Sequence, residues 1–327
     1  MSESMRALCT GITGQTGSFL AEILLEKGYK VYGLVRRTST PNTSRIKHIL
    51  NELELVQGDL TDQSSLDRIL RSVKPHEVYN MGAQSDVHMS FTEPITTADI
   101  TGLGTLRLLE AIRNSEFRSK FLTASSSEMF GKVTETPQNE NTRFHPRSPY
   151  GVSKLFAHWA TINYRESYNL FAISAIMYNN ESERRGENFV TRKISKAVAN
   201  IKLGKQKELI LGNTDAKRDW GYSKDYALGL YLAMQYSIPK EWIFATGESH
   251  SVQEFLETAF RHVGLEWQQY VKRDTRFTRP AEVDTLCGNS TEAKTLLDWR
   301  PTISFQELVE LMVDYDLETE ARNSNNV

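Results

Sequence analysis

The feature that most constrains the fold of this chain is a set of three glycines between a strand and a helix. The apolar run Arg6–Gly11 leads directly into Gly14 and Gly17, and Gln15–Gly28 then carries its apolar side chains on one helical face. Glycine lets a backbone approach a pyrophosphate closely, and the free N–H groups that open a helix attract an anion. The pattern predicts a dinucleotide-binding turn, and the alternative is an ordinary glycine turn.

Strand-like and helix-like segments alternate over the first two-thirds of the chain. Strands joined by helices need crossovers, so this order predicts a parallel sheet covered on both faces. We therefore expect an α/β fold, a Rossmann-type doubly wound parallel sheet with a smaller C-terminal substrate-binding α/β cap. The sheet domain should comprise residues 1–178 and about 213–245, the cap about 179–212 and 246–321, and a flexible tail 322–327. The expected strands after the first are Lys30–Val35, Leu53–Gln57, Glu77–Asn80, Lys120–Thr123 and Asn169–Tyr178.

The balance of charges excludes several kinds of partner. The chain has 39 Lys and Arg against 41 Asp and Glu, a formal net charge of −2, so it has no broad basic surface for nucleic acid or an anionic membrane. No apolar run approaches the ~20 residues that span a bilayer, and no signal-peptide pattern is visible. Cys9 and Cys287 are too few for a disulfide framework or a metal site. We expect a cytoplasmic protein that holds no metal and binds neither nucleic acid nor membrane.

Two arginines, Arg36 and Arg37, follow the second strand, at the position where NAD-binding proteins usually carry Asp or Glu. A carboxylate there binds the ribose 2′-hydroxyl, whereas arginine pairs with a 2′-phosphate. The pair favours NADP over NAD, and the alternative is two solvated loop arginines. Asp59, after the third strand, is placed to meet the adenine edge.

A tyrosine and a lysine lie four residues apart in Tyr150-Gly151-Val152-Ser153-Lys154, so on a helix they share one face. Lys154 would hydrogen-bond the nicotinamide ribose and lower the pKa of Tyr150 by its charge. Tyr150 would then exchange a proton with a sugar hydroxyl. Ser126 follows an earlier strand, at the sheet edge where active sites of parallel sheets form, so its hydroxyl completes the predicted site.

Glu128 distinguishes among the reactions that this set of residues supports. An epimerase or a simple dehydrogenase needs the hydroxyl, the tyrosine and the lysine, but no carboxylate two residues after Ser126. Once C4 of a sugar is a ketone, the C5 proton is acidic, and Glu128 could remove it and protonate the departing C6 hydroxyl. The residue indicates a dehydratase, and the alternative is a surface or helix-capping glutamate.

Over nearly the entire chain these residues resemble one family, the GDP-mannose 4,6-dehydratases, which are extended short-chain dehydrogenase/reductases. The glycine spacing resembles that wider class, while Phe189–Lys193 and Gly212–Gly221 are more specific to the family. The resemblance implies conversion of GDP-mannose to GDP-4-keto-6-deoxymannose plus water, with a hydride passing from C4 to NADP and back to C6. The matching stretches are Thr10–Gly17, Gly58–Asp62, Tyr79–Ser85, Ala124–Gly131, Pro146–Lys154, Asn163–Ser167, Phe189–Lys193, Leu211–Gly221 and Arg279–Asp284.

The resemblance also implies a role for each matching residue. It implies that the catalytic residues are Ser126, Glu128, Tyr150 and Lys154. The NADP contacts it implies are Gly11, Ile12, Thr13, Gly14, Gln15, Thr16, Gly17, Arg36, Arg37, Thr38, Ser39, Asp59, Leu60, Met81, Gly82, Ala83, Gln84, Ser85, Tyr150, Lys154, Asn180 and Arg185. The GDP-sugar contacts it implies are Ser85, Ser126, Glu128, Tyr150, Asn179, Val190, Lys193, Arg218, Arg279 and Glu282.

The residues leave other activities open, and four positions depart from the family pattern. The other possible activities are a GDP-manno-heptose 4,6-dehydratase, whose substrate is larger at C6, a nucleotide-sugar epimerase or reductase, and a non-catalytic NADP-sensing protein. Family members form dimers or tetramers, so a homodimer or homotetramer is expected, with the Arg36–Arg45 loop as a candidate tetramer contact. The departures are Ser126 for a threonine, Asn180 for a histidine near NADP, Thr16 for an aspartate in the glycine loop and Thr96 for a frequent tyrosine.

Overall fold

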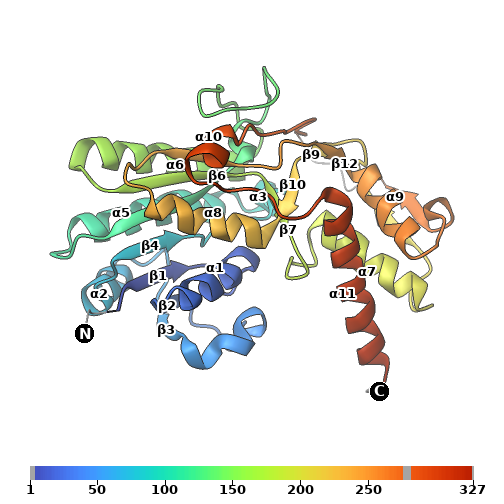
Figure 1. Ribbon diagram of the computed structural model, residues 1–327, viewed down its shortest axis with the longest axis horizontal. Coiled ribbons are helices and arrows are strands. Elements are labelled where there is room, and N and C mark those ends of the chain that lie inside the picture. The colour runs from blue at the N-terminus through green and yellow to red at the C-terminus, as the bar shows by residue number, and fades with distance from the viewer. Residues whose placement is uncertain (1–3, 275–280, 326–327) are drawn as a thin grey trace.

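The computed structural model describes residues 4–274 and 281–325, and its main layer is a seven-stranded sheet (Figure 1). The strand order is β11-β6-β5-β4-β1-β2-β3, and every neighbouring pair is parallel. Strand order reverses beside β1, the point at which open α/β sheets place their ligands. The strands are β1 (Arg6–Thr10), β2 (Lys30–Val35), β3 (Glu54–Gln57), β4 (Glu77–Asn80), β5 (Lys120–Ser126), β6 (Ala172–Met177) and β11 (Glu241–Phe244).

Helices cover both faces of the sheet, as the alternation of strands and helices predicts. Ala7 and Cys9 of β1 pack in one apolar cluster with α1 and α8, while Leu8 packs in another with α2, α5 and α6. This alternation follows from the two-residue period of a strand. The doubly wound fold is therefore confirmed. The covering helices are α1 (Gln15–Glu26), α2 (Gln63–Val73), α5 (Gly104–Arg113), α6 (Pro149–Tyr168) and α8 (Ser223–Gln235).

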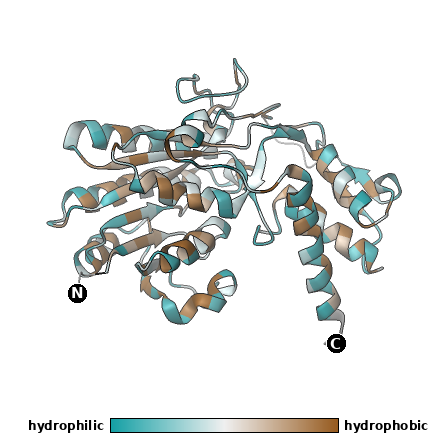
Figure 2. Cartoon of the chain, in the orientation of Figure 1, coloured by the Kyte–Doolittle hydropathy of each residue, from teal (hydrophilic) through white to brown (hydrophobic). Residues whose placement is uncertain are grey.

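The inner strands read as unbroken apolar runs because they are buried from both sides. All six residues of β6 are buried, and all four of β4. Figure 2 shows the matching pattern, with hydrophobic residues on the strands and on the helices beside them and hydrophilic residues on the connecting loops. Cys9 is fully buried, as expected of a small apolar side chain in a strand.

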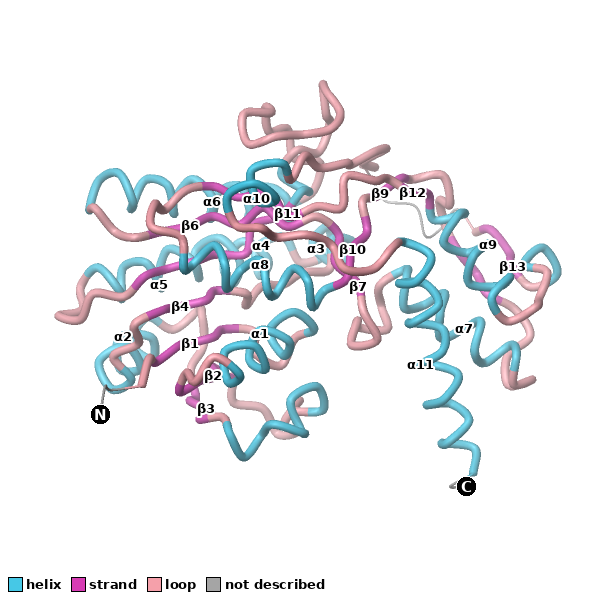
Figure 3. Tube along the Cα trace, viewed as in Figure 1, coloured by secondary structure: helices cyan, strands magenta, loops and turns pink. Residues whose placement is uncertain are grey.

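A third apolar cluster lies to one side of the sheet, at the right of Figures 1 and 3. Its centre includes Ile194, Phe255 and Met312, which come from three different helices. These elements fall within the expected cap, although the domain boundaries themselves stay a prediction. They are α7 (Val190–Lys202), β8 (Leu209–Leu211), α9 (Val252–His262), β13 (Val271–Arg273) and α11 (Phe305–Asn325).

Short strands connect the sheet with this third apolar cluster. β7 (Asn179–Glu181) pairs in parallel with β10 (Trp220–Tyr222), and β9 (Lys217–Arg218) pairs antiparallel with β12 (His250–Ser251). Two or three residues are too few to show a hydrophobic period, so the sequence does not predict these pairings. The remaining elements are α3 (Val87–Thr92), α4 (Pro94–Thr97), α10 (Thr291–Leu296), the 3-10 helices Ser44–Glu52, Ser127–Met129 and Trp267–Gln269, and the π-helix Ala98–Leu103.

Several boundaries differ from those expected, among them the start of β6, which is Ala172 and not Asn169. β5 continues three residues beyond Thr123 and ends at Ser126. Helix α11 runs past Arg322 to Asn325, so the flexible tail expected from residue 322 begins inside a helix. Its polar end lacks the apolar period that marks a helix in sequence. Within the described ranges, no helix is both long enough and apolar enough to cross a membrane.

Candidate active site

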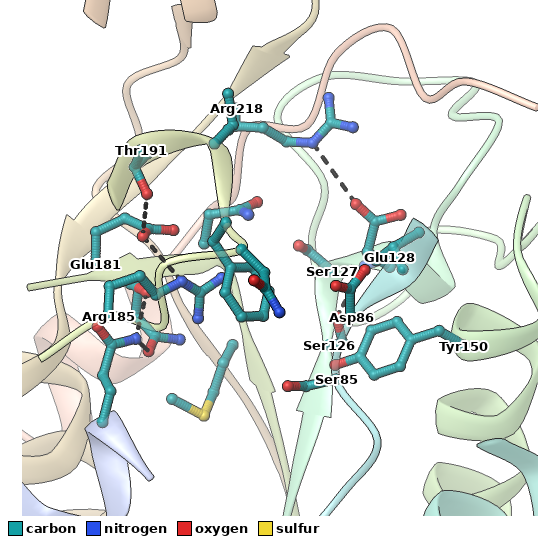
Figure 4. Close-up of a pocket in the computed structure, with 18 of the residues that line it drawn as sticks. Ser85, Asp86, Ser126, Ser127, Glu128, Tyr150, Glu181, Arg185, Thr191 and Arg218 are labelled. Atoms are coloured by element: carbon teal, nitrogen blue, oxygen red, sulfur yellow. Dashed lines mark hydrogen bonds and ion pairs between the residues drawn. The ribbon is translucent and has the colours of Figure 1, made fainter. Parts of the chain in front are cut away.

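A cavity of about 950 Å³ opens where β1, β4 and β5 end, and the cap closes its other side. The sheet side supplies the glycine loop, Ser126, Glu128, Tyr150 and Lys154. The opposite wall is lined by residues that follow β6, together with parts of α7, β8 and β9. Figure 4 shows both walls, with Glu181, Arg185 and Arg218 facing Glu128 and Tyr150. The structure therefore brings the predicted catalytic residues into one cavity.

The glycine loop is closed by contacts that leave no room for a side chain. Gly11 has φ +66°, and a Cβ on it would lie 2.8 Å from the backbone N of Gly82. A Cβ on Gly17 would lie 2.2 Å from the carbonyl oxygen of Gly11. Helix α1 begins after Gly14 without a side-chain cap, and Gly14 to Gly17 line the cavity. The opening N–H groups of this helix are thus placed to bind an anion.

The glycine loop is joined to the segment after β6 by neutral hydrogen bonds. The Oδ1 atom of Asn180 accepts bonds from Thr16 Oγ1 at 2.8 Å, Ser223 Oγ at 3.1 Å and Gln15 Nε2 at 3.2 Å. Gln15 also donates to the carbonyl of Asn180 at 2.8 Å and accepts from Ser182 at 2.7 Å. Two of the four departures from the family pattern, Thr16 and Asn180, are therefore direct partners.

Three of the expected catalytic residues, Ser126, Tyr150 and Lys154, are positioned by the end of β5 and the first turns of α6. Ser126 is the last residue of β5, and its Oγ accepts a bond from the backbone N–H of Glu128 at 3.2 Å. Ser148 caps α6 by accepting from the N–H of Gly151 at 3.0 Å, which fixes the turn that carries Tyr150. Lys154 then donates from Nζ to the carbonyl of Ala124 at 2.5 Å.

Burial controls the protonation of Tyr150 and Lys154. It raises the pKa of Tyr150 to about 12, assisted by the charge of Glu128 and opposed by hydrogen bonding to Ser126. It lowers the pKa of Lys154 to about 8. The expected lowering of the Tyr150 pKa by Lys154 is therefore not seen. The Lys154 ammonium is held by a backbone carbonyl and lies 5.8 Å from the centre of the Tyr150 ring.

Glu128 faces Arg218 across the cavity. Its Oε1 lies 3.6 Å from Nε of Arg218, and each side chain is only 8% exposed (Figure 4). Nη1 of Arg218 donates to the carbonyl of Val283 at 2.7 Å and to that of Lys217 at 2.9 Å. The carboxylate is thus held at the end of β5 opposite a cation that β9 provides.

Several expected substrate residues line the same cavity. Lys193 donates from Nζ to the carbonyl of Ile210 at 2.8 Å, and burial lowers its pKa. Oδ1 of Asn179 is buried and accepts no hydrogen bond from the described residues, as fits an atom that awaits a ligand. Arg279 lies outside the described residues. The others that line the cavity are Ser85, Val190, Arg218 and Glu282.

Of the expected cofactor residues, about half line the cavity. These are Gly11, Gly14, Gln15, Thr16, Gly17, Met81, Ala83, Ser85, Tyr150, Lys154, Asn180 and Arg185. The described lining does not include Ile12, Thr13, Arg36, Arg37, Thr38, Ser39, Asp59, Leu60, Gly82 or Gln84. Arg36 and Arg37 are exposed at the end of β2, and their role stays a prediction. Arg45, from the loop considered as a tetramer contact, turns inward and donates to the carbonyls of Thr13 and Arg184.

Three carboxylates that line the cavity, Asp86, Glu181 and Glu187, are not singled out by the sequence, and the first two lie just after strands of the sheet. Asp86 follows directly on Ser85 and accepts bonds from the N–H groups of His88 and Met89, which begins α3. Glu181 lies in β7, pairs with Arg185 at 3.0 Å and accepts from Thr191 at 2.5 Å, and burial raises its pKa. Their places after the ends of β4 and β6 were the available signal. Among the described residues, no group of three or more His, Cys, Asp or Glu side chains is arranged to hold a metal ion.

Comparison with known proteins places this site in context. A family model described as GDP-mannose 4,6 dehydratase matches residues 8–312. GDP-mannose 4,6 dehydratase 1 of Arabidopsis thaliana is 52% identical over 328 residues, which cover 97% of this chain and 91% of the relative. The human GDP-mannose 4,6 dehydratase is 49% identical over 346 residues, which cover 98% of this chain and 93% of the relative.

Among solved structures, the UDP-glucose 4-epimerase of Thermus thermophilus in complex with NAD superimposes with a TM-score of 0.83. It is 27% identical in sequence, and the match covers 95% of this chain and 99% of the epimerase. The fold thus extends to proteins of other activities, so function has to be argued from the site.

Proposed function

Because the chain belongs to the GDP-mannose 4,6-dehydratase family, we propose that it converts GDP-mannose to GDP-4-keto-6-deoxymannose and water. The observation that carries this proposal is the placement of Glu128 in one cavity with Ser126, Tyr150 and Lys154. An epimerase or reductase on this fold has no need of a second acid–base group beside the hydroxyl. A protein that only senses a nucleotide has no need of the buried tyrosine and lysine.

A nicotinamide dinucleotide fits the glycine-loop end of the cavity. The loop leaves no room for side chains, and the uncapped first turn of α1 lines the cavity, which suits a pyrophosphate. Gly11 to Gly17, Met81, Ala83 and Lys154 would hold the cofactor. When bound, it supplies the hydride acceptor for C4 and the hydride donor for C6.

We propose NADP as that cofactor, because Arg36 and Arg37 stand where a carboxylate would select NAD. Both arginines are exposed at the end of β2, where they can meet a 2′-phosphate from the rim. The guanidinium group binds phosphate oxygens in pairs, so it favours NADP by direct contact.

The chain's own residues then move two protons. Tyr150 acts in its ionised form, a minority because its pKa is about 12, and takes the proton of the C4 hydroxyl as C4 becomes a ketone, while Ser126 hydrogen-bonds the same oxygen and Lys154 holds the ribose. Glu128 takes the C5 proton and gives it to the C6 hydroxyl, which leaves as water and creates a double bond between C5 and C6. As C6 is reduced, Tyr150 returns to C5 the proton that it took from the C4 hydroxyl, so the protons balance.

The substrate end of the cavity offers groups for a GDP-sugar. Lys193 and Arg218 provide the positive charge that a diphosphate requires, and Glu282 provides an acceptor for a ribose diol. Oδ1 of Asn179 is free among the described residues to accept a donor from the ligand. Ser126 lacks the methyl group of threonine, and this observation favours GDP-manno-heptose as the second candidate substrate.

The test is incubation of the purified protein with GDP-mannose and, separately, with GDP-manno-heptose, with the products read by mass spectrometry. We expect GDP-mannose to lose 18 mass units, roughly the mass of one water, without added NADP if the cofactor is retained on purification. Faster loss of water from the heptose would assign the second candidate. If neither GDP-sugar loses water, or if the product has the same mass as the substrate, the protein is not a dehydratase of these sugars.

We also propose that the protein is a homo-oligomer that works in the cytoplasm. One face of α6 leaves Val152, Phe156 and Trp159 between 45% and 55% exposed, and such a patch marks an interface. A second copy is the occupant that fits, because the family resemblance implies dimers or tetramers. Light scattering should give a multiple of 37.3 kDa. Trp159→Glu should lower it, and a monomeric wild-type protein would contradict the proposal.

A further inference from the structure

Arg218 stands between two negative groups of the proposed reaction. It pairs with the Glu128 carboxylate in this structure, and the diphosphate of a GDP-sugar is the second anion proposed for it. We infer that Arg218 is a positioning residue that links the two: diphosphate binding draws its charge away from Glu128 and frees that carboxylate to act as a base. The inference rests on the proposed function, since it needs a substrate that carries a diphosphate.

The contact between Arg218 and Glu128 is an ion pair rather than a hydrogen bond. Nε and Oε1 are 3.6 Å apart, beyond ordinary hydrogen-bond length, and both side chains are buried to the same degree (Figure 4). Burial makes the attraction strong, because little water is present to screen it. The longer separation means that no fixed geometry has to be broken when a second anion approaches.

The backbone around Arg218 keeps the guanidinium in place. Nη1 is held by the carbonyls of Val283 and Lys217. Strand β9 pairs with β12, and the N–H of Lys217 donates to the carbonyl of Asp284 at 2.8 Å. Arg218 therefore has little freedom to swing between partners. Two anions have to share one cation at one position, and each weakens the other's hold on it.

Two other cations that line the cavity, Arg185 and Lys154, have partners of their own. Arg185 pairs with Glu181 at 3.0 Å, and Lys154 donates to the carbonyl of Ala124. Asp86 lines the same cavity and adds negative charge, while Tyr150 is protonated because its pKa is about 12. The structure pairs Glu128 with Arg218, so we expect a change in the charge of Arg218 to act directly on Glu128.

The chemical consequence is a carboxylate whose partner is shared once substrate is bound. In the free protein, Glu128 is paired with Arg218. Once the diphosphate shares the charge of Arg218, that pair holds the carboxylate less tightly, and Glu128 is available to take the C5 proton and deliver it to O6. Coupling between two sites is reciprocal, so neutralising Glu128 must in turn favour the diphosphate.

The experiment measures this reciprocal effect with GDP as the probe and the NADP-loaded protein in a calorimeter. We expect Glu128→Gln to bind GDP at least about 5-fold more tightly than the wild type at pH 7.5. Glu187→Gln is the matched control, because it removes a carboxylate that lines the cavity but pairs with Lys196. A change at Glu128 no greater than that at Glu187, or weaker binding, would overturn the inference.

A double-mutant cycle separates the link from a general charge effect. In an Arg218→Gln background, Glu128→Gln should leave GDP affinity within 2-fold. An undiminished effect there would show that Arg218 does not carry the link. Arg218→Lys serves if Arg218→Gln does not fold, since it keeps the charge and should retain part of the coupling.

The measurements on these variants also separate the inference from the proposed function. If wild type dehydrates GDP-mannose but Glu128→Gln binds GDP no more tightly than wild type does, the inference fails alone. If it neither turns over GDP-mannose nor binds GDP, the proposed function fails with it.

Discussion

The glycine-loop end of the cavity is built from backbone and neutral side chains, whereas the Glu128 end is built from buried charges. At the first end, Gln15, Thr16, Asn180 and Ser223 form a network without an ionised group. At the second, Arg218 faces a carboxylate that is as buried as itself. A neutral network holds one shape over a wide pH range, while buried charges respond to each proton and ligand. On the proposed assignment, the cofactor's pyrophosphate binds at the neutral end, while the substrate's diphosphate and the acid–base chemistry share the charged end.

The charged end should be the more sensitive of the two, and Glu128→Gln tests this most directly. The amide keeps the shape of the carboxylate but cannot take a proton from C5. We expect kcat to fall by at least ~100-fold, the usual scale for a positioned acid–base group. C4 oxidation, followed as a transient absorbance of reduced nicotinamide, should persist in part. Dehydration of GDP-mannose at a rate close to that of the wild type would contradict the proposed mechanism.

Buried charge should also be costly to the fold, and Lys154 provides the measure. Its native pKa of about 8 lies below the ordinary 10.5, so the native state binds fewer protons than the unfolded chain between these values, and stability rises with pH across that window. Below about pH 8 the full cost is present. Lys154→Met should therefore raise the free energy of unfolding by about 2–3 kcal/mol at pH 7 and by little at pH 10.5.

Denaturant titration of both proteins at these two pH values provides the measurement. Lys207→Met, at an exposed lysine, is the matched control and should change stability by less than about 0.5 kcal/mol. A gain at Lys154 that is equal at both pH values would show that packing rather than charge is responsible.

Ser126 lies where the charged end begins, and its hydroxyl should matter less than Glu128. Removing it leaves a polar partner unpaired at a cost of ~1–3 kcal/mol, so Ser126→Ala should lose roughly 10- to 100-fold in kcat/KM. Ser126→Thr keeps the hydroxyl and should be tolerated within a few-fold on GDP-mannose. If the missing methyl makes room for a larger sugar, Thr should impair only the heptose. Full activity of the Ala variant on both substrates would make Ser126 a bystander.

Arg36 and Arg37 test whether charged residues at the edge of the neutral end contribute to cofactor binding. Replacing Arg36 and Arg37 with glutamine should weaken NADP binding by about 10-fold or more, the value of one charge-assisted hydrogen bond, and change NAD binding by only a few-fold. The nucleotide released from the wild-type protein on denaturation gives an independent check. Recovery of NAD, or equal loss of affinity for both cofactors, would show that these arginines are solvated.

The smallest effect is expected within the neutral network itself. Asn180→Ala removes an acceptor shared by three donors, so we expect NADP to bind a few-fold more weakly with almost no change between pH 6 and 9. Asn163→Ala, on the exposed surface of α6, is the control. If NADP affinity changed steeply with pH in either variant, the glycine-loop end would not be the pH-independent network that we describe.

The sequence predicts the parts of this molecule whose signals are local. The glycine spacing, the shared helical face of Tyr150 and Lys154, and the hydroxyl at the end of β5 can each be found within a few residues. The partners across the cavity cannot. Thr16 and Asn180 are 164 residues apart, and Arg218 reaches Glu128 from a two-residue strand that has no periodicity. The raised pKa of Tyr150 also depends on burial, which a motif does not report.

The closure of the glycine loop affects how a mutational scan of this chain should be interpreted. A side chain at Gly17 would collide with the carbonyl of Gly11 before any ligand arrived. Every substitution there should therefore abolish activity, and the loss would resemble that of a residue that touches the cofactor. Intolerance at this position measures the geometry of the turn. Only a variant that still folds, tested with several nucleotides, can show whether a position is required for the geometry of the turn or for contact with the cofactor.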